Sequence, residues 1–206
     1  FSLGDRINSS YFDHIDALIH TAYDLSLTKS SDIKAINING TIDLFQAAID
    51  AKVKKIIYLS SQSAAKNAMS EYGAAKYQIE QFAKQHGIYS LRPGLIFSVN
   101  PGGLVGTMSN IIKKLPIIPL IGNGHFTLHL SHIDSLSELI DKLLASHTPI
   151  KDPIFAAHPQ PFTFKKILQN IAKENRKRCL FIPIPWRLIY LTLKFAELIK
   201  LPLKIR

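Results

Sequence analysis

A short strand followed by a spaced tyrosine–lysine pair constrains the fold of this 206-residue chain more than any other feature. Residues Ile56–Leu59 are β-branched, aromatic or aliphatic, and they predict a buried strand of a parallel sheet. The strand ends in a hydroxyl-rich stretch, residues 60–63, and Tyr72 and Lys76 follow at the spacing that places two side chains on one face of a helix. Ligands of open α/β sheets bind at the carboxyl ends of the strands, so this strand–helix unit predicts a functional site.

The Tyr72–Lys76 pair is suited to proton transfer. A nearby cation favours the charged form of an acid, so we expect Lys76 to lower the pKa of the Tyr72 phenol from its ordinary value of about 10. The phenol would then exchange a proton near neutral pH, while a serine hydroxyl from the strand end binds the substrate oxygen. Together these groups predict hydride chemistry at a carbon that carries an oxygen.

Apolar segments along the chain predict strands that alternate with helices, and therefore an α/β fold with a parallel sheet and helices on both faces. The expected strands are Ala17–His20, Ile56–Leu59 and Ile88–Ile96. The expected helices are residues 33–51, 72–86, 104–114, 135–145 and 164–173. Histidines 125, 129 and 132 have the spacing of a metal site on a helix, but residues 127–131 alternate as a strand does, so no metal ion is predicted.

Five stretches of the chain follow one another in an order that can be matched to a known family. They are Asp16–Ala22, Asn37–Thr41 with the helix that follows, the serine strand with Tyr72, Lys76 and Glu80, Leu91–Leu95, and Gly122–Asp134. Together they resemble an extended short-chain dehydrogenase/reductase of the NAD-dependent epimerase/dehydratase family, whose members act on nucleotide sugars. Several motifs in register support one another more strongly than a single motif does.

The resemblance implies a Rossmann-like, doubly wound parallel sheet with a small C-terminal substrate-binding region. Residues 1–100 would form a partial NAD(P)-binding domain, to which residues 125–146 return. Residues 101–124 and 147–206 would form the substrate-binding region. Members of the family often dimerise through the Tyr/Lys helix and its neighbour, so the resemblance also implies a possible homodimer.

The resemblance also implies roles for individual residues, with NAD or NADP as the cofactor. Ser61, Tyr72 and Lys76 would be catalytic, with Ser63 as the alternative serine, and Lys76 would also hold the nicotinamide ribose. Tyr72 and Lys76 would share the cofactor contacts with His20, Ala22, Leu59, Ser60, Arg92, Pro93 and Gly94. Substrate contacts would come from Ser63, Asn100 and Arg176.

Two departures from the family pattern qualify these expectations. The family opens with a strand and a Gly-x-x-Gly-x-x-Gly turn that binds the dinucleotide pyrophosphate, whereas residues 1–13 contain only Gly4. We therefore expect the chain to be a piece of a longer protein or to lack an N-terminal part. The segment between Ser61 and Tyr72 is also short, which leaves the sugar and the choice of serine open.

The charge of the chain is concentrated near its C-terminus. Residues 151–206 contain 12 Lys and Arg against 3 Asp and Glu, whereas residues 1–150 contain 13 against 12. The amphipathic segment 186–201 is too short and too charged to span a bilayer, and it predicts either packing against the substrate region or peripheral contact with the inner face of the membrane. Nothing resembles a nucleic-acid-binding module. The single Cys179 excludes an internal disulfide and fits the cytoplasm.

These observations predict an NAD(P)-dependent epimerase or reductase acting on a nucleotide sugar or a similar small substrate. Dehydration ranks last, because the family's dehydratases use an Asp-Glu pair near the serine and this chain has Gln62-Ser63. Two alternatives stay open: an oxidoreductase of another small alcohol or ketone, and a non-catalytic dinucleotide-binding relative.

Overall fold

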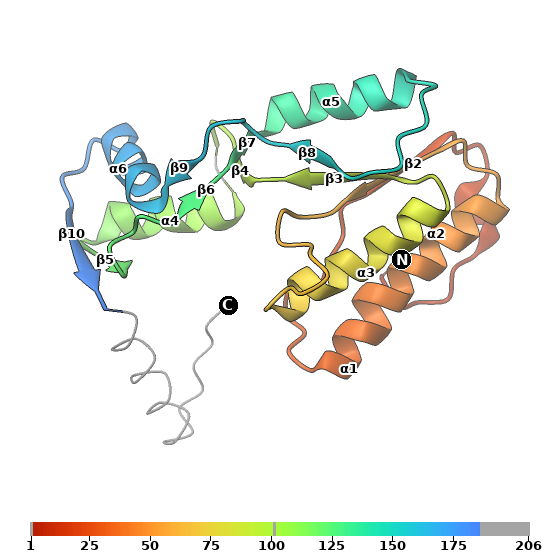
Figure 1. The fold of residues 1–206 in the computed structure, drawn as a ribbon, viewed down its shortest axis with the longest axis horizontal. Helices are drawn as coiled ribbons and strands as arrows, with labels where there is room; N and C mark the ends of the chain where they lie inside the picture. Colours follow the sequence, from red (N-terminus) through yellow and green to blue (C-terminus); the bar gives the residue numbers. More distant parts are fainter. Residues whose placement is uncertain (1, 101, 186–206) are drawn as a thin grey trace. The chain divides into compact units, whose positions relative to one another are not determined.

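The computed structural model describes residues 2–100 and 102–185, and the chain divides into two compact units (Figure 1). Unit 1 comprises residues 1–94 and 134–157. Unit 2 comprises residues 95–133 and 158–206. The predicted domains divide the chain at different residues, since they assigned residues 125–146 rather than 134–157 to the Rossmann part.

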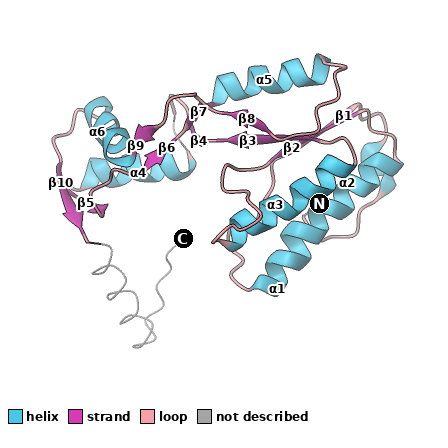
Figure 2. Cartoon of the chain, viewed as in Figure 1, coloured by secondary structure: helices cyan, strands magenta, loops and turns pink. Residues whose placement is uncertain are grey.

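Strands and helices alternate along most of unit 1, as the sequence predicts (Figure 2). In chain order its elements are η1 (Ser9–Phe12), β1 (Ala17–His20), α1 (Ser30–Asp32), the π-helical segment η2 (Ile33–Asn39), α2 (Gly40–Asp50), β2 (Lys55–Leu59), α3 (Glu71–Gln85), β3 (Tyr89–Pro93), α5 (Ile133–Ala145) and β8 (Ile154–Ala156).

The sheet of unit 1 has the strand order β1-β2-β3-β8, and all of its pairs are parallel. Leu18 lies opposite Ile56, and Leu59 lies opposite Leu91, so the carboxyl ends of the first three strands meet at one edge. Helices α2 and α3 cover one face of the sheet and α5 covers the other (Figure 1). The predicted doubly wound α/β fold is confirmed.

The core of unit 1 determines how α3 is rotated on the sheet. Ala75, Ile79 and Ala83 are spaced four residues apart, and all three are buried against the face of β2 that carries Tyr58. Burying a large apolar side chain such as Ile79 contributes about 1.5–3 kcal/mol. Because this stripe faces the sheet, the adjacent Lys76 and Glu80 are buried as well.

Several predicted elements differ from the observed ones. The predicted helix 33–51 begins as the π-helical segment η2 and becomes α-helical only at Gly40. The predicted strand 88–96 ends at Pro93, because the chain then leaves the sheet and forms β4 (Leu95–Phe97) in unit 2. The predicted strand 127–131 is split into β6 (Thr127–Leu128) and β7 (Leu130–His132), which pair with different partners. Strand β8 was not predicted.

Up to residue 185, unit 2 consists of short strand pairs and two helices. Strand β5 (Ile117–Ile121) pairs with β10 (Leu180–Ile184) and β4 with β7, both in parallel, whereas β6 and β9 (Phe162–Thr163) are antiparallel. Met108, Ile112, Leu168 and Ala172 pack between the helices and the inner face of β5. These helices are α4 (Gly103–Lys114) and α6 (Phe164–Glu174).

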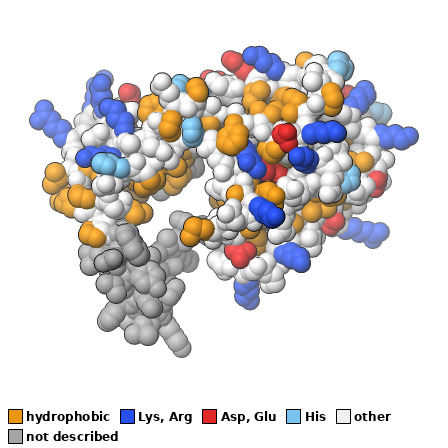
Figure 3. Space-filling view, viewed as in Figure 1, with side chains coloured by type: hydrophobic (Ala, Val, Ile, Leu, Met, Phe, Trp, Pro, Cys, Tyr) orange, Lys and Arg blue, Asp and Glu red, His pale blue; other side chains and the backbone are white. Residues whose placement is uncertain are grey.

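The described residues include only the first portion, residues 151–185, of the basic C-terminal part. Residues 151–185 contain seven Lys and Arg against Asp152 and Glu174. In Figure 3 the Lys and Arg side chains are spread over the visible face rather than gathered in one continuous patch. No helix in residues 2–100 or 102–185 has the length and apolar character needed to cross a membrane. The predicted membrane contact through 186–201 lies outside the described residues.

Candidate active site

The carboxyl end of β2 and the first two turns of α3 bring Ser61, Tyr72 and Lys76 together in unit 1. Ser70 caps α3 by accepting a hydrogen bond from the Gly73 amide at 3.1 Å, which places Tyr72 in the first turn. A Cβ at Gly73 would overlap the Ser63 carbonyl oxygen, so a glycine is required where the serine loop crosses the helix. The Ser63 amide donates to Ser61 Oγ at 3.1 Å and closes that loop.

The Ser61 side chain lies close enough to the Tyr72 phenol to influence its pKa. Burial raises the pKa of Tyr72, and Ser61 lowers it by a smaller amount, so the pKa lies above its ordinary value. We expected Lys76 to lower this pKa, and that expectation is wrong in direction. The physical reason is that desolvation of the half-buried phenol outweighs the interactions that favour the phenolate.

Lys76 is the most unusual group of the site, because its side chain is charged and buried. Only 3% of the residue is exposed, and its Nζ donates a hydrogen bond to the Leu59 carbonyl at 2.8 Å. Three tyrosine rings surround the ammonium group: their centroids lie 4.8 Å (Tyr58), 5.2 Å (Tyr23) and 5.8 Å (Tyr72) from Nζ. Cation–π attraction offsets part of the cost of removing this charge from water.

Burial lowers the pKa of Lys76 to about 8, and the nearby Glu80 opposes that shift. Lys76 therefore remains mostly protonated at neutral pH but loses its proton far more readily than an exposed lysine does.

Glu80 and Arg92 form a second polar contact between α3 and the sheet. Glu80 is 1% exposed, and the Arg92 guanidinium binds both of its carboxylate oxygens, at 2.8 Å from Nε and 2.5 Å from Nη2. The carboxylate raises the pKa of Arg92 further. Arg92, which was predicted to contact the cofactor, thus has two donors engaged within the protein.

A groove of about 560 Å³ lies beside the carboxyl end of β1. His20, Ala22 and Tyr23 line it, together with residues 2 and 3, residues 19, 21 and 24, Ile36 and Leu44. Tyr23 links the groove to the serine–tyrosine centre, because its ring packs edge-on against Tyr72 with the centroids 4.8 Å apart.

His20 contributes to the groove as a neutral side chain. It is 4% exposed, and its Nε2 lies 3.0 Å from Thr41 Oγ1. Burial, together with the smaller effect of the Lys76 charge, lowers the pKa of His20 to about 4.

Asn37, in the π-helical segment η2, fixes the loop that carries Tyr23. Its Oδ1 accepts from the Asp24 amide at 2.8 Å, and its Nδ2 donates to the Asp24 carbonyl at 2.9 Å. The Asn37 side chain also lowers the pKa of the Tyr23 phenol, although burial raises that pKa by more. Single π-helical turns are frequent at functional sites, and here the turn directs a fully buried amide at the loop.

Within residues 2–100 and 102–185, three buried polar atoms near this site have no hydrogen-bond partner: Tyr58 Oη, Ser60 Oγ and Gln62 Nε2. They occur at alternate positions of β2 and its continuation. Leaving such atoms unpaired costs about 1–3 kcal/mol each, so they mark a place where a polar ligand or water binds favourably. None of these three residues lines the groove, whose own wall of His20, Ala22 and Tyr23 at the carboxyl end of β1 is where a dinucleotide would fit. The sequence offers no glycine-rich turn for the pyrophosphate.

The remaining predicted positions are placed as follows. The Leu59 carbonyl accepts from Lys76, Pro93 is buried, and Gly94 follows at the end of β3. Ser63 is exposed beside Ser61. Asn100 and Arg176 are exposed and belong to unit 2.

Tyr23 and Tyr58 were missed as parts of the site. The only sequence signal for them was the position of an aromatic residue near the end of a strand: Tyr58 lies within β2, and Tyr23 lies three residues after β1.

Comparison with protein families and solved structures is consistent with this geometry. Residues 5–154 match the model of the NAD dependent epimerase/dehydratase family. No curated protein sequence matches the chain.

Three solved structures illustrate the structural similarity. ADP-L-glycero-D-manno-heptose-6-epimerase from Helicobacter pylori has a TM-score of 0.75 at 15% identity, over 90% of this chain and 67% of the other. UDP-glucose 4-epimerase from Thermotoga maritima, solved with UDP-glucose, has a TM-score of 0.70 at 18% identity, over 86% of this chain and 67% of the other. DesIV, a dTDP-glucose 4,6-dehydratase from Streptomyces venezuelae solved with NAD, has a TM-score of 0.73 at 16% identity, over 90% of this chain and 66% of the other. At these identities the similarity establishes the fold, and the chain spans about two thirds of each protein's length.

Proposed function

This chain belongs to the NAD-dependent epimerase/dehydratase family, and from that premise we propose that it carries out NAD-dependent hydride transfer at a hydroxyl-bearing carbon of a nucleotide sugar. Membership confirms the predicted family, enzyme class and nicotinamide cofactor. The nucleotide-sugar substrate is supported by similar folds, since the Thermotoga maritima epimerase was solved with UDP-glucose.

The observation that carries the proposal is the buried Lys76 beside the Tyr72 ring, at the strand end where the Ser61 side chain acts on the pKa of Tyr72. A serine–tyrosine pair at the carboxyl end of a parallel strand can bind one substrate oxygen from two sides. The ammonium group of Lys76 supplies a fixed positive charge next to the phenol ring. Charge placed in advance where a phenolate develops lowers the barrier without reorganisation during the reaction.

NAD, when bound, supplies the acceptor for a hydride from the substrate carbon. In that oxidation the phenolate form of Tyr72, after losing its own proton to solvent, accepts the proton of the substrate hydroxyl, and Ser61 Oγ holds the same oxygen. In the reverse direction the phenol returns its proton to the carbonyl oxygen. The raised pKa of Tyr72 keeps the phenol protonated at neutral pH, so the site is ready for the reductive step.

The residues suited to hold the cofactor lie along the groove at the end of β1. His20 and Ala22 line its wall, and Tyr23 leads from it to Tyr72. The neutral state of His20 means that the groove gains no positive charge from it near pH 7. Lys76 lies beside both tyrosines.

We infer an epimerase or a reductase rather than a dehydratase. Gln62 and Ser63 stand where the acid–base pair of the family's dehydratases is expected, and neither is a carboxylic acid. An epimerase returns the hydride to the opposite face of the carbon, whereas a reductase releases the product after one transfer.

The test uses protein expressed from its full reading frame, with NAD and a panel of UDP-sugars. NADH absorbance and chromatography of the sugar report turnover. Tyr72→Phe keeps the ring and removes the hydroxyl, so we expect turnover to fall by about 10²–10⁴-fold. The matched control is Tyr77→Phe, which changes a half-buried tyrosine of the same helix.

Unchanged turnover in Tyr72→Phe would overturn the catalytic assignment. NAD binding without turnover of any sugar by the wild type would favour a non-catalytic relative. Turnover of a simple alcohol but of no UDP-sugar would favour the alternative substrate class.

A further inference from the structure

Helix α3 is held to the sheet by two polar anchors that lie one turn apart. Lys76 bonds to the Leu59 carbonyl at the end of β2. Glu80 bonds to Arg92 on β3, the neighbouring strand. Tyr72, Lys76 and Glu80 are spaced four residues apart and therefore occupy one face of the helix.

We propose that the Glu80–Arg92 pair is the positioning element of the Tyr72–Lys76 site, because it holds α3 on β3 and fixes the Glu80 carboxylate one helical turn from Lys76. The expected effect of the pair on turnover rests on the function proposed above. Its effects on the position of α3 and on the ionisation of Lys76 can be measured whether or not that function is correct. The pair thereby acquires a role different from the cofactor contact that the sequence implied for Arg92.

The geometry of the pair is suited to positioning. The guanidinium binds both carboxylate oxygens, and such a bidentate contact fixes orientation as well as distance. Glu80 is 1% exposed and the Arg92 side chain 18%, so water competes little for either group. The Ser60 amide donates to the Leu91 carbonyl at 2.7 Å, which couples the strand carrying Arg92 to the strand end that receives Lys76.

The electrostatics point to the same role. The groups that face Lys76 are the phenols of Tyr23, Tyr58 and Tyr72, the ring of His20, and the carboxylate of Glu80, behind which lies the Arg92 guanidinium. The phenols and the imidazole are neutral near pH 7. Glu80 is therefore the anion that opposes the loss of charge caused by burial.

An exposed ion pair on the same helix provides a matched control. Lys84, one turn beyond Glu80, binds Asp152 at 2.8 Å, with side chains 50% and 83% exposed. The two pairs share a helix and a chemistry but differ in burial. Exposed pairs of this kind contribute little to structure.

The experiment compares Glu80→Gln with Asp152→Asn in the full-length protein. Isotope-labelled lysine allows the ionisation of Lys76 to be followed by NMR without any substrate, and Lys76→Met assigns the signal. We expect the midpoint of Lys76 to fall by about one pH unit in Glu80→Gln and to stay constant in Asp152→Asn. Turnover at pH 8, where measured, should fall about fivefold in Glu80→Gln alone, because the protonated fraction of Lys76 falls from about one half to about one tenth.

Removing one partner of a buried pair can unfold a protein, so a second variant is included. Glu80→Leu with Arg92→Leu replaces both charges by apolar side chains, a change that folded proteins often tolerate. Because the Arg92 cation is lost together with the Glu80 anion, the midpoint of Lys76 should fall in this variant by less than in Glu80→Gln. An unchanged midpoint in a folded Glu80 variant, or a fall in Asp152→Asn as well, would overturn the proposal.

Failure of the proposed function would look different. In that case no protein in the series, including the wild type, turns over a nucleotide sugar, yet the NMR midpoints still decide whether Glu80 maintains the charge of Lys76. Normal turnover together with a normal Lys76 midpoint in the double leucine variant would instead leave the function intact and refute the positioning role.

Discussion

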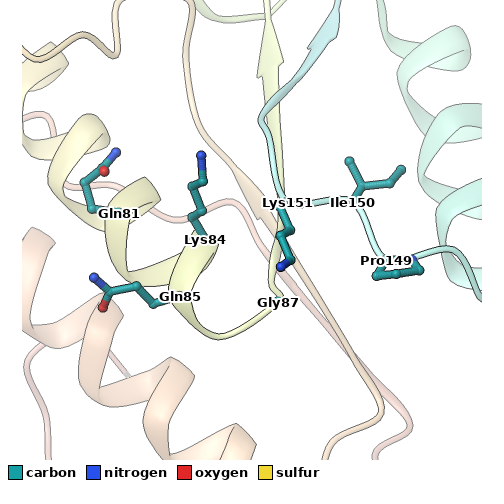
Figure 4. Close-up of a pocket in the computed structure, with 7 residues that line it drawn as sticks. All are labelled: Gln81, Lys84, Gln85, Gly87, Pro149, Ile150 and Lys151. Carbon is teal, nitrogen blue, oxygen red and sulfur yellow. The ribbon is translucent and has the colours of Figure 1, made fainter.

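Unit 1 carries two grooves of similar size with very different chemistry. The groove at the carboxyl end of β1 has a volume of about 560 Å³, and the groove at the far end of α3 has about 530 Å³. The second lies between the end of α3 and the segment before β8, as Figure 4 shows. It is lined by Gln81, Lys84, Gln85, Gly87, Pro149, Ile150 and Lys151.

The difference lies in burial rather than in volume or charge. Lys84 and Lys151, in the second groove, are exposed. Beside the first groove, Lys76 is buried among three tyrosine rings and its pKa is lowered to about 8. Charged groups with strongly perturbed pKa values concentrate at functional sites, because burial is costly and persists where function requires it. Of the two lysines on α3, the buried Lys76 is therefore the candidate for a functional role, and the exposed Lys84, eight residues further on, is not.

The largest expected effect contrasts these two environments directly. Lys76→Met removes the positive charge beside Tyr72 while keeping an unbranched side chain of similar length. We expect turnover to fall by at least about 10²-fold. Lys84→Met, on the same helix but exposed, should leave turnover unchanged. Steady-state kinetics with a UDP-sugar and NAD measure both, and equal losses in the two variants would erase the proposed difference.

A smaller effect is expected where the serine loop crosses α3. Gly73→Ala would drive a methyl group into the Ser63 carbonyl, so the loop or the helix must shift. We expect the free energy of unfolding to fall by about 3 kcal/mol. Gly102→Ala is the control, because its added Cβ meets no atom within 4 Å. Urea denaturation measures both, and equal stability of the two variants would show that the crossing is not tight.

The smallest effect concerns pH. The pKa of His20 is about 4 in the folded protein and about 6.5 when unfolded, so the unfolded chain binds more protons between these values. The stability contributed by neutral His20 is present above pH 6.5 and is lost as pH falls toward 4. At pH 5 the loss should be about 1–2 kcal/mol.

Thermal denaturation from pH 7 to pH 4.5 tests this expectation. His20→Gln should flatten the dependence, whereas His86→Gln, which changes an exposed histidine, should leave it steep. A steep dependence in His20→Gln would assign the acid sensitivity to other groups.

Much of unit 1 could be predicted because its signals are local. Strand β1 was predicted at its observed residues, and helix α3 to within one residue at each end. The strand β8 was missed because three residues after a proline carry too little periodicity to be distinguished from a loop. Strand β4 was predicted as part of β3 because the apolar run is continuous, and only the three-dimensional structure shows that the chain changes sheets at Gly94.

By itself the sequence determined the parallel sheet, the helices that cover it and the serine–tyrosine–lysine spacing, since each follows from side-chain periodicity over a few turns or residues. Only the tertiary structure decided the electrostatics. Tyr72 has a raised pKa, and Arg92 pairs with Glu80 twelve residues away. Desolvation and through-space charge depend on groups that meet after folding, such as Tyr23 beside Lys76, and local periodicity carries no record of them.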